Sequence, residues 1–339
     1  MKILHINNFA FKKSGAEFYN TDRKISAGLV LNGHHVYDFS FHDMAYYGTI
    51  WRTKKVGKKW ANQEVLKVIK NFEPDLILIG HSSLLSVDTL KAVKAQYPQT
   101  KIAFWYVDWI CVDKKANFIK EWSPYLDSIF VTTSGELLKT LGHNNTVAYM
   151  PNMSLGSIDH LKNFEQDKFT YELVFCGSAS DPDRTQFIRS LQQKIQHIPA
   201  RYCGFDDDPK VFGNGYFKVL GQSRMGLNYS RANSLDLYTS DRITQLTGNG
   251  LLTFTPRIPG FESLFSAQEV VYFDNVDDLA SKVHYYVAHP EEARLIAQAG
   301  WQRTHSSYNA QRVTKFMLET IYQQPYSEAY EWKDHVFQC

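Results

Sequence analysis

The chain has 339 residues, of which 44% are apolar and 21% charged, and its formal net charge is +2. This length exceeds what one hydrophobic core usually supports, so we expect two domains of roughly 150 residues with a cleft between them. The small net charge gives no reason to expect a nucleic-acid partner, and the sequence contains no run of about 18 apolar residues that would span a membrane.

The N-terminus predicts a short strand over Met1 to Asn7 instead of a signal peptide. We therefore expect a cytoplasmic protein. Surface aromatic and basic side chains leave open a peripheral association with the inner face of a membrane.

The first half of the chain alternates strand and helix patterns, as in a parallel, doubly wound α/β sheet. Residues 1–152 form the predicted first domain, and the polar residues 153–169 form a predicted linker. Strands are expected at 2–6, 35–40, 76–80, 101–107, 125–132 and 147–150, and helices at 17–32, 63–72, 88–96, 114–121 and 136–141.

The second half repeats this alternation and predicts a second domain over residues 170–323. Residues 324–339 are a C-terminal tail that can pack back on the first domain. Strands are expected at 171–176, 200–204, 225–229, 251–255 and 270–273, and helices at 183–195, 276–288, 290–304 and 310–323.

The stretch from Tyr238 to Pro256 combines a helix start that can bind an anion with an abrupt return to a strand. Thr239, Ser240 and Asp241 offer N-cap oxygens, and the helix N-terminus and the charge of Arg242 can hold a diphosphate. Gly248-Asn249-Gly250 ends this helix after barely two turns. The alternative is an ordinary capped helix with a surface arginine.

Two further segments place polar residues directly after predicted strands. Gly177-Ser178 allows a ligand to approach the backbone closely, and Arg184 can complete a phosphate pocket. The same residues can instead form a tight turn capped by Asp181-Pro182. Asn228 can contact nucleotide or sugar hydroxyls, or simply satisfy a turn.

These segments, in this order, resemble the GT-B glycosyltransferases, specifically the group 1 transferases and their CgeB-like relatives. The resemblance implies two Rossmann-like domains that face a cleft, with a nucleotide-sugar donor bound mainly by the second domain. It also implies that the loop of Gly15 faces the donor phosphates. The implied donor-binding residues are Gly15, Gly177, Ser178, Arg184, Asn228, Tyr238, Thr239, Ser240, Arg242 and Gln245.

One departure from this family concerns two glutamates that many retaining members carry eight positions apart. Gln245 and Leu237 occupy those positions here, so neither carboxylate is present. Glutamine can still hydrogen-bond a ribose hydroxyl, but it brings no charge. Asp236 and Asp241 are neighbouring acids, although an offset of one residue turns a helical side chain by about 100°. The donor and the stereochemical outcome stay open.

An inverting transfer needs a catalytic base, which the resemblance assigns to the first domain. His81 and Asp108 each follow a predicted strand, and the resemblance favours Asp108 by its position. A histidine has an ordinary pKa near 6.5, whereas Asp108 would need desolvation, which Trp105, Tyr106 and Trp109 could provide. Either residue can instead be a hydrogen-bonded turn residue. Ser14 and Glu17 have the spacing of a helix capping box.

The run Asp206-Asp207-Asp208 could hold a divalent cation, but Phe205 and Pro209 bracket it as a solvated turn. Because the GT-B arrangement replaces metal with a helix dipole and arginine charge, we expect no metal and no cofactor other than the nucleotide-sugar itself. Cys111, Cys176 and Cys203 are predicted to be small apolar fillers.

The function that follows is a glycosyltransferase that moves a sugar from a nucleotide-sugar donor to a glycan, lipid-linked or small hydroxylated acceptor, as in polysaccharide biosynthesis. The alternatives are a nucleotide-sugar epimerase of the same fold and a catalytically inactive nucleotide- or glycan-binding protein. A nicotinamide dehydrogenase is disfavoured, because residues 7–15 lack the glycine fingerprint of dinucleotide-binding folds.

Overall fold

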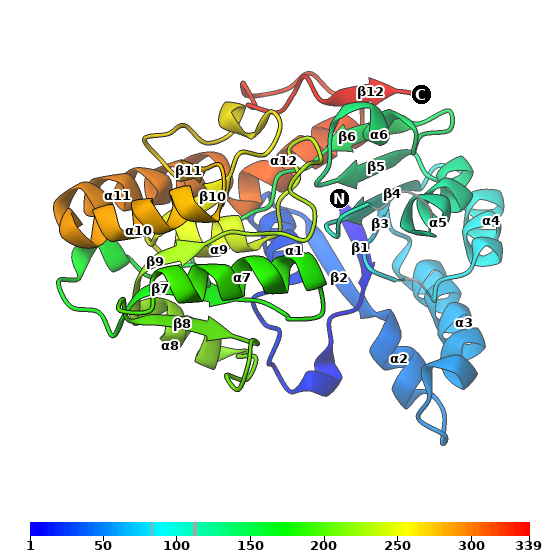
Figure 1. The fold of residues 1–339 in the computed structure, drawn as a ribbon. Helices are drawn as coiled ribbons and strands as arrows, with labels where there is room; N and C mark the ends of the chain where they lie inside the picture. The colour runs from blue at the N-terminus through cyan, green and yellow to red at the C-terminus, as the bar shows by residue number, and fades with distance from the viewer. Residues whose placement is uncertain (83, 111–113) are drawn as a thin grey trace. The chain divides into compact units, whose positions relative to one another are not determined.

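The computed structural model describes residues 1–82, 84–110 and 114–339, which form two compact units (Figure 1). Unit 1 comprises Met1–Pro151 together with Ala310–Cys339, and unit 2 comprises Asn152–Asn309. The chain therefore leaves unit 1 once and returns to it after unit 2 is complete. Cys111, one of the predicted fillers, lies outside the described residues.

Unit 1 is built on a seven-stranded sheet in the order β12-β6-β5-β4-β3-β1-β2. The first six strands in the sequence run parallel, and β12 joins the edge antiparallel to β6. All residues of β3, β5 and β6 are buried, as expected for parallel strands covered on both faces. The strands are β1 (Lys2–Asn7), β2 (His35–Ser40), β3 (Leu76–Ile79), β4 (Lys101–Tyr106), β5 (Ser128–Val131), β6 (Thr146–Tyr149) and β12 (Val336–Gln338).

The helices of unit 1 follow the predicted alternation, with one addition and one extension. The additional helix is α2, and α3 begins nine residues before the predicted start. Short 3-10 turns lie at η1 (Phe11–Lys13) and η2 (Ser123–Tyr125). The α-helices are α1 (Thr21–Leu31), α2 (Phe41–Tyr47), α3 (Lys54–Phe72), α4 (Val87–Gln96), α5 (Lys114–Trp122), α6 (Gly135–Lys139) and α12 (Ala310–Ile321).

Helix α12 belongs to unit 1, whereas the sequence analysis assigned residues 310–323 to the second domain. The reason lies in its contact with α1 at Gly28. A Cβ at Gly28 would stand 2.3 Å from the main-chain oxygen of Ala310 and 2.7 Å from Oγ1 of Thr314. The missing side chain lets the two helices meet backbone to backbone, and the buried face of α12, with Val313, Phe316 and Met317, closes over unit 1.

Unit 2 holds a parallel five-stranded sheet in the order β11-β10-β9-β7-β8. Its core is made by apolar side chains of all five strands and of α7, α10 and α11. The strands are β7 (Tyr171–Cys176), β8 (Ala200–Cys203), β9 (Ser223–Leu227), β10 (Leu252–Pro256) and β11 (Val271–Phe273). The helices are α7 (Pro182–Lys194), α8 (Asn214–Gly221), α9 (Arg242–Gly248), α10 (Val276–Ala288) and α11 (Pro290–Ser307), with 3-10 turns η3 (Asn163–Glu165) and η4 (Phe261–Ser263).

The strand order of unit 2 contains a topological switch point. From β7 the chain first adds β8 on one side of the sheet and then β9, β10 and β11 on the other. In open α/β sheets the crevice outside the carboxyl ends of the two strands at such a point is the usual place for a ligand. The carboxyl ends of β7 and β9 therefore mark where a site is expected in this unit.

The predicted linker, residues 153–169, is part of unit 2 and packs against it. Asn163 is 1% exposed, and its side-chain amide donates to the main-chain oxygens of Leu220 at 2.7 Å and Ser223 at 2.8 Å. Ser154 pairs with Asn309 in an isolated β-bridge. Polar residues of the segment that was predicted to be a linker instead form these buried hydrogen bonds.

The capping box predicted at Ser14 and Glu17 is wrong. Ser14 has a φ of 52° and closes η1, and α1 begins only at Thr21 after the N-cap residue Asn20. Glu17 instead forms an ion pair with Lys13. Across the described part of the chain, no helix is both long and apolar enough to cross a bilayer.

Candidate functional site

The loop after β7 turns directly into α7 at the switch point of unit 2. Asp181 caps α7 by accepting a hydrogen bond from the main-chain N–H of Arg184 at 2.9 Å, and Pro182 occupies the first turn. A Cβ at Gly177 would lie 2.8 Å from the ring of Phe175, so the backbone turns where a larger residue would clash. The strand thus turns into the helix within a few residues at the edge where a ligand is expected.

Arg184 is 6% exposed and donates through Nη2 to the main-chain oxygen of Ser178. Its Nε is buried and makes no hydrogen bond. Burial, followed by the charges of Arg242 and Arg231, lowers the pKa of Arg184 to about 10. Keeping the Arg184 guanidinium charged therefore costs free energy, because the group is desolvated and lies near two other cations.

Arg242 joins the ends of the two strands that flank the switch point. Its Nε donates to the main-chain oxygen of Cys176 at 3.0 Å, and its Nη1 donates to that of Tyr229 at 3.3 Å and to Oγ of Ser240 at 3.0 Å. The guanidinium also lies 4.9 Å from the centre of the Phe175 ring. Among the described residues Nη2 has no hydrogen-bond partner, so Arg242 keeps a donor for a ligand.

The three arginines of this edge, Arg184, Arg231 and Arg242, form no ion pair with any carboxylate of residues 1–82, 84–110 or 114–339. These arginines donate their hydrogen bonds to neutral oxygens. Arg231, for example, donates to Oγ of Ser180 at 3.3 Å. Of the three, Arg184 alone is buried, and burial of a cation without an ion pair is unfavourable. Perturbed groups of this kind cluster at functional sites, which makes this edge a candidate anion site. The sequence analysis did not include Arg231, because only the folded loop brings it to this edge.

The loop before α9 is anchored by buried polar side chains. Asn228 is fully buried, and its side-chain nitrogen donates to Oγ1 of Thr239 at 2.8 Å and of Thr255 at 3.0 Å. Oγ of Ser230 accepts from the main-chain N–H of Ser240 at 3.1 Å. These bonds give Asn228 and Thr239 a positioning role here, and their contact with a donor stays a prediction. Tyr238 is buried beside Arg184, whose pKa it influences.

The predicted N-cap of α9 differs from the structure. Asp241 is the N-cap residue but has helical φ and ψ, and no side chain caps the helix. The helix has seven residues, the two turns that were predicted, so its dipole is small. The carboxylate of Asp241 instead accepts a hydrogen bond from Nε2 of Gln245 at 2.8 Å. Arginine charge, more than a helix terminus, makes this edge positive.

Gln245 is 5% exposed and has a partner on each side of its amide. Its Oε1 accepts from the hydroxyl of Tyr216 at 2.8 Å, while its Nε2 is bonded to Asp241. A ribose hydroxyl could bind Gln245 only by replacing or sharing these bonds. Leu237, the other departing position, is buried with a φ of 57°.

In unit 1, the predicted residues Gly15, His81 and Asp108 lie after β1, β3 and β4, which are neighbours in the sheet. Gly15 has a φ of 84°, and a Cβ there would meet no atom within 4 Å. His81 stacks on Tyr106 with ring centres 4.5 Å apart, and its Nε2 accepts from the main-chain N–H of Val107 at 3.5 Å.

The predicted desolvation of Asp108 is wrong, because its side chain is exposed and accepts a hydrogen bond from the hydroxyl of Tyr106 at 3.4 Å. Trp105, which was expected to shield it, is 1% exposed and donates its indole N–H to His5 at 3.1 Å. The three candidates nevertheless share the carboxyl edge of this sheet.

Asp22 is a titratable residue at this edge that the sequence analysis missed. It lies in the first turn of α1, after the loop of Gly15, and is 4% exposed with Oδ1 lacking a hydrogen bond. Burial raises its pKa to about 7, against the lowering effect of the main-chain N–H and charge of Arg23. Nothing in the local pattern distinguishes it from an ordinary acid in a first helical turn.

The carboxylates of Asp206 and Asp208 are engaged by basic side chains. Asp208 pairs with Arg201 at 2.9 Å and Asp206 with Arg189 at 3.4 Å. No group of three or more His, Cys, Asp or Glu side chains in the described ranges is arranged to hold a metal ion. The expectation of a metal-independent reaction stays a prediction.

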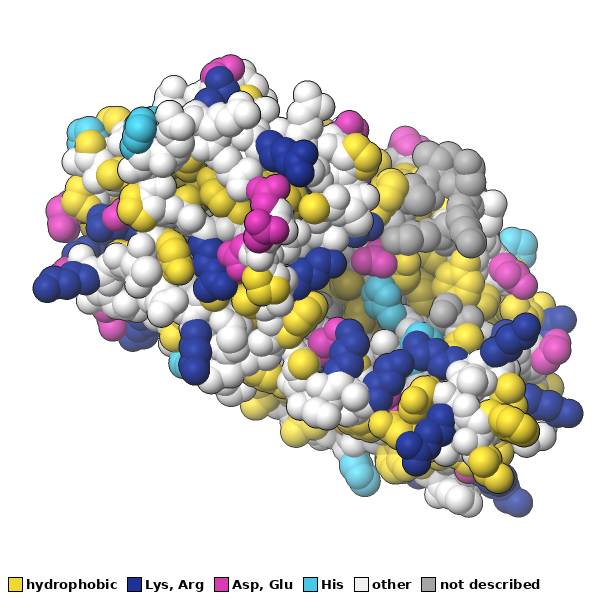
Figure 2. Space-filling view, turned by 60° about the horizontal axis from the view of Figure 1, so that its bottom comes forward, with side chains coloured by type: hydrophobic (Ala, Val, Ile, Leu, Met, Phe, Trp, Pro, Cys, Tyr) yellow, Lys and Arg dark blue, Asp and Glu magenta, His cyan; other side chains and the backbone are white. Residues whose placement is uncertain are grey.

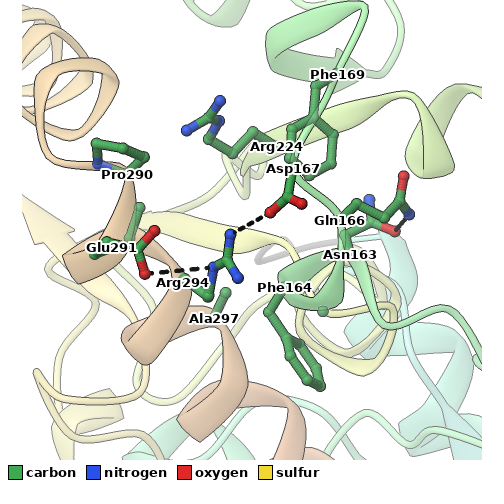
Figure 3. Close-up of a pocket in the computed structure, with 12 residues that line it drawn as sticks. Asn163, Phe164, Gln166, Asp167, Phe169, Arg224, Pro290, Glu291, Arg294 and Ala297 are labelled. Carbon is green, nitrogen blue, oxygen red and sulfur yellow. Dashed lines mark hydrogen bonds and ion pairs between the residues drawn. The ribbon is translucent and has the colours of Figure 1, made fainter.

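A cavity of about 190 Å³ opens elsewhere in unit 2 (Figure 3). It is lined by Asn163, Phe169 and Arg224 and by the start of α11, where Arg294 forms ion pairs with Asp167 at 2.8 Å and Glu291 at 3.7 Å. Arg224 and Gly250 lie at the amino ends of β9 and β10. The cavity is therefore at the opposite edge of the sheet from the three arginines.

Comparison with known proteins gives the fold and the class of unit 2. A family model described as "Glycosyl transferase-like" matches residues 184–319. The chain carries a glycosyl transferase-like domain. The predicted enzyme class, a glycosyltransferase, is confirmed at the level of this domain. The match begins at Arg184, includes Arg231 and Arg242, and ends within α12. No curated protein matches the sequence.

Solved structures with this fold are similar over almost the whole chain. A sucrose-phosphate synthase from Thermosynechococcus elongatus has a TM-score of 0.67 at 10% identity, over 95% of this chain and 99% of that one. HepE from Anabaena, in complex with UDP and glucose, has a TM-score of 0.60 at 9% identity, over 95% and 99%. A UDP-N-acetylglucosamine 2-epimerase scores 0.52 at 10% identity, over 97% and 99%. The predicted GT-B fold, with two Rossmann-like parallel sheets, is confirmed.

Proposed function

We propose that this protein transfers a sugar from a nucleotide-sugar donor to a hydroxylated acceptor, which can be a glycan, a lipid-linked molecule or a small molecule. The observation that carries the proposal is a set of three arginines, Arg184, Arg231 and Arg242, at the switch point of unit 2, none of which forms an ion pair with a carboxylate among the residues that the structure describes. A nucleoside diphosphate supplies negative charge to these guanidinium groups, of which Arg184 is offset in part by the nearby charge of Asp181. HepE, a structural neighbour, was solved with UDP and glucose.

In this reaction the arginines stabilise the leaving diphosphate as the bond to the anomeric carbon breaks. Arg242 carries a free Nη2 and is fixed by two main-chain oxygens, so it needs little rearrangement when charge develops. The N–H of Gly177 donates to the main-chain oxygen of Cys203 at 3.0 Å, so any neutral main-chain donors come from the loop between Ser178 and α7. No metal is required in this scheme, because guanidinium charge takes its place.

For the acceptor, we assign the base to Asp108 in preference to His81. The Nε2 of His81 accepts a main-chain hydrogen bond, and its ring is stacked on Tyr106, so its second nitrogen carries the proton when the ring is neutral. Asp108 is exposed, and its carboxylate can reach a hydroxyl from solvent. Asp108→Asn should abolish transfer in an inverting enzyme and leave donor binding intact, whereas His81→Gln should reduce transfer only partly.

We also propose that the protein belongs to the CgeB-like subfamily and that it inverts the anomeric configuration of the donor sugar. The absence of both glutamates of the retaining pair favours an inverting reaction, for which a base such as Asp108 is needed. The anomeric configuration of the product, measured by NMR, tests this directly. A retained configuration would remove the role given to Asp108.

The experiment that tests the function is a thermal-shift panel of the diphosphates of uridine, guanosine, adenosine, cytidine and thymidine. Binding to the native state raises the melting temperature by mass action, so one nucleotide should give a selective shift. The matching nucleotide-sugar is then incubated without acceptor. Slow hydrolysis supports transfer, and an epimerised sugar indicates the epimerase. Binding without turnover, even with hydroxylated acceptors, identifies a binding protein, and no shift at all contradicts the donor site.

A further inference from the structure

Helices α2 and α3 of unit 1 form a hairpin whose turn exposes large apolar side chains. Ile50 is 98% exposed and Trp51 77%, and they are flanked by Tyr47 at 54% and Val56 at 53%. Residues 47–59, from Tyr47 to the second turn of α3, are called the basic tip below. Isolated exposed apolar residues are normal, but four within ten positions of one turn are a patch that water solvates poorly.

The charge of this segment has one sign. Residues 44–63 contain Arg52, Lys54, Lys55, Lys58 and Lys59 and no Asp or Glu. With a net charge of +2 for the whole chain and +5 for this segment, the remainder carries −3. Lys and Arg side chains lie among hydrophobic ones on the side of the molecule where α2 and α3 are found (Figures 1 and 2).

None of these five cations forms an ion pair with a carboxylate in the ranges that the structure describes, although the charge of Asp43 partly offsets that of Lys54. Thr53 caps α3, so Lys54 and Lys55 occupy its first turn, where the helix dipole disfavours positive charge and which contains no acid. Lys54 also faces Lys12 from the loop after β1, and burial together with the charge of Lys12 lowers the pKa of Lys54.

The hairpin under the basic tip is packed tightly. A Cβ at Gly57 would lie 1.7 Å from the main-chain oxygen of Ala45, and a Cβ at Gly48 would lie 2.0 Å from the ring of Trp60. Gly57 therefore allows α3 to meet α2 at backbone distance, and Gly48 makes room for the ring of Trp60. The close packing of α2 and α3 fixes the position of the turn between them, and this position leaves Ile50 and Trp51 exposed.

We propose that the basic tip docks on the surface of a bilayer that contains anionic lipids, with Ile50 and Trp51 entering the interface and the lysines meeting the headgroups. A Trp beside an aliphatic side chain prefers the boundary between headgroups and acyl chains, and basic residues add attraction to anionic lipid. The nearly complete exposure of Ile50 favours a lipid surface over a nucleic acid or another polyanion, which would use the charges but leave the aliphatic side chain in water. This assigns a surface to the peripheral association considered above, and it does not depend on the transferase function.

The test is flotation of the full-length protein with vesicles made of phosphatidylcholine alone or of equal parts of phosphatidylcholine and phosphatidylglycerol. We expect binding to the anionic vesicles only. Lys55→Gln with Lys58→Gln and Lys59→Gln should lower the partition coefficient on the order of 100-fold, since each cation near an anionic surface contributes about a fivefold factor. Ile50→Ser with Trp51→Ser should lower it at least tenfold while all five charges remain.

Two matched controls separate the basic tip from general effects. Lys67→Gln with Lys70→Gln removes charge at the other end of α3, and Leu295→Ser removes a side chain of unit 2 that is 66% exposed. Both variants should bind the vesicles like the unaltered protein. All variants should keep the thermal shift given by the donor nucleotide, so failure of membrane binding and failure of the proposed function are distinguishable.

Tryptophan fluorescence reports whether the side chain of Trp51 enters the membrane interface. Trp51 is the most exposed of the seven tryptophans, so on binding its emission should shift to shorter wavelength and be quenched by acyl chains brominated near the headgroup. Trp51→Phe should bind but lose this signal. The proposal would be overturned if the protein did not bind anionic vesicles, or bound neutral vesicles equally well. It would also be overturned if the protein bound heparin and vesicles alike and this binding survived Ile50→Ser with Trp51→Ser.

Discussion

The Nε of Arg242 donates to the main-chain oxygen of Cys176 at 3.0 Å, although the two residues are 66 positions apart in the sequence. The same guanidinium reaches Tyr229 at the end of β9, so one side chain spans the switch point of unit 2. Because these acceptors are neutral, the positive charge remains available to a bound anion. This relationship underlies the first prediction.

Replacing Arg242 should weaken donor binding strongly. Charge-assisted hydrogen bonds contribute about 1.5–3 kcal/mol, so Arg242→Ala should raise the Kd of the nucleoside diphosphate about 10- to 100-fold. Arg242→Lys keeps the charge but cannot bridge both strand ends, and it should recover only part of the affinity. Titration calorimetry measures both. Arg189→Ala, at an exposed arginine of α7 that pairs with Asp206, is the control and should bind normally.

Arg184→Met should separate stability from binding. Because Arg184 is buried without an ion pair in the described structure, an apolar side chain of similar length should raise the free energy of unfolding of the ligand-free protein by about 1 kcal/mol. The same change should weaken nucleotide binding at least tenfold. Urea unfolding with and without nucleotide gives both values. A variant that is less stable and binds normally would show that Arg184 has only a structural role.

Gln245→Glu restores the carboxylate found in many retaining relatives, but it should destabilise this protein. The new carboxylate would lie where Nε2 of Gln245 now donates to Asp241 at 2.8 Å, and two like charges would meet. We expect a loss of about 1–3 kcal/mol at pH 8 and a smaller loss at pH 4, where the pair shares a proton. Adding Asp241→Asn should restore most of the stability. An unchanged melting temperature at pH 8 would contradict the contact.

Asp22 should make stability depend on pH between about 4 and 7. Its folded pKa of about 7 lies above the ordinary value, so the native state holds the proton more tightly and the free energy of unfolding falls as pH rises. Three units correspond to at most about 4 kcal/mol. Asp22→Asn should therefore raise the melting temperature at pH 8 and leave it nearly unchanged at pH 4. Equal shifts at both values would mean that the carboxylate is not buried.

Gly28→Ala should destabilise unit 1 by about 1–3 kcal/mol, because the added methyl group would overlap the carbonyl of Ala310 and force α12 away from α1. Gly215→Ala in α8 is the matched control. A Cβ there meets no atom within 4 Å, and alanine should stabilise that helix slightly. Urea denaturation of both variants tests this, and similar midpoints would falsify the close contact between the two helices.

The sequence predicted those parts of the fold whose patterns are local. Strand β7 was predicted with its observed bounds, because Tyr171 to Cys176 is a mainly apolar run between a polar segment and a glycine. The three-residue strand β12 was missed, since an edge strand formed by pairing with β6 has no pattern of its own. The helix start predicted at Ser14 failed because that residue adopts a left-handed conformation, which the capping-box spacing does not exclude.

The site was predictable only in part for the same reason. Gly177, Arg184 and Arg242 could be chosen from the residues after strands and at helix starts. Their meeting depends on β9 lying beside β7, which is a property of strand order and not of spacing along the chain. Arg231 and Asp22 carried no signal, because the importance of Arg231 comes from its neighbouring charges and that of Asp22 from its burial, and a sequence gives neither.

The return of the chain to unit 1 has a consequence for synthesis. Residues 152–309 leave the ribosome before α12 and β12, so unit 2 can fold while unit 1 still lacks the helix that covers α1 and the strand that closes the β6 edge. Until residues 310–339 emerge, unit 1 exposes an apolar helix face and an unpaired strand edge to solvent or to chaperones. Synthesis of unit 1 therefore begins before that of unit 2 but is completed after it.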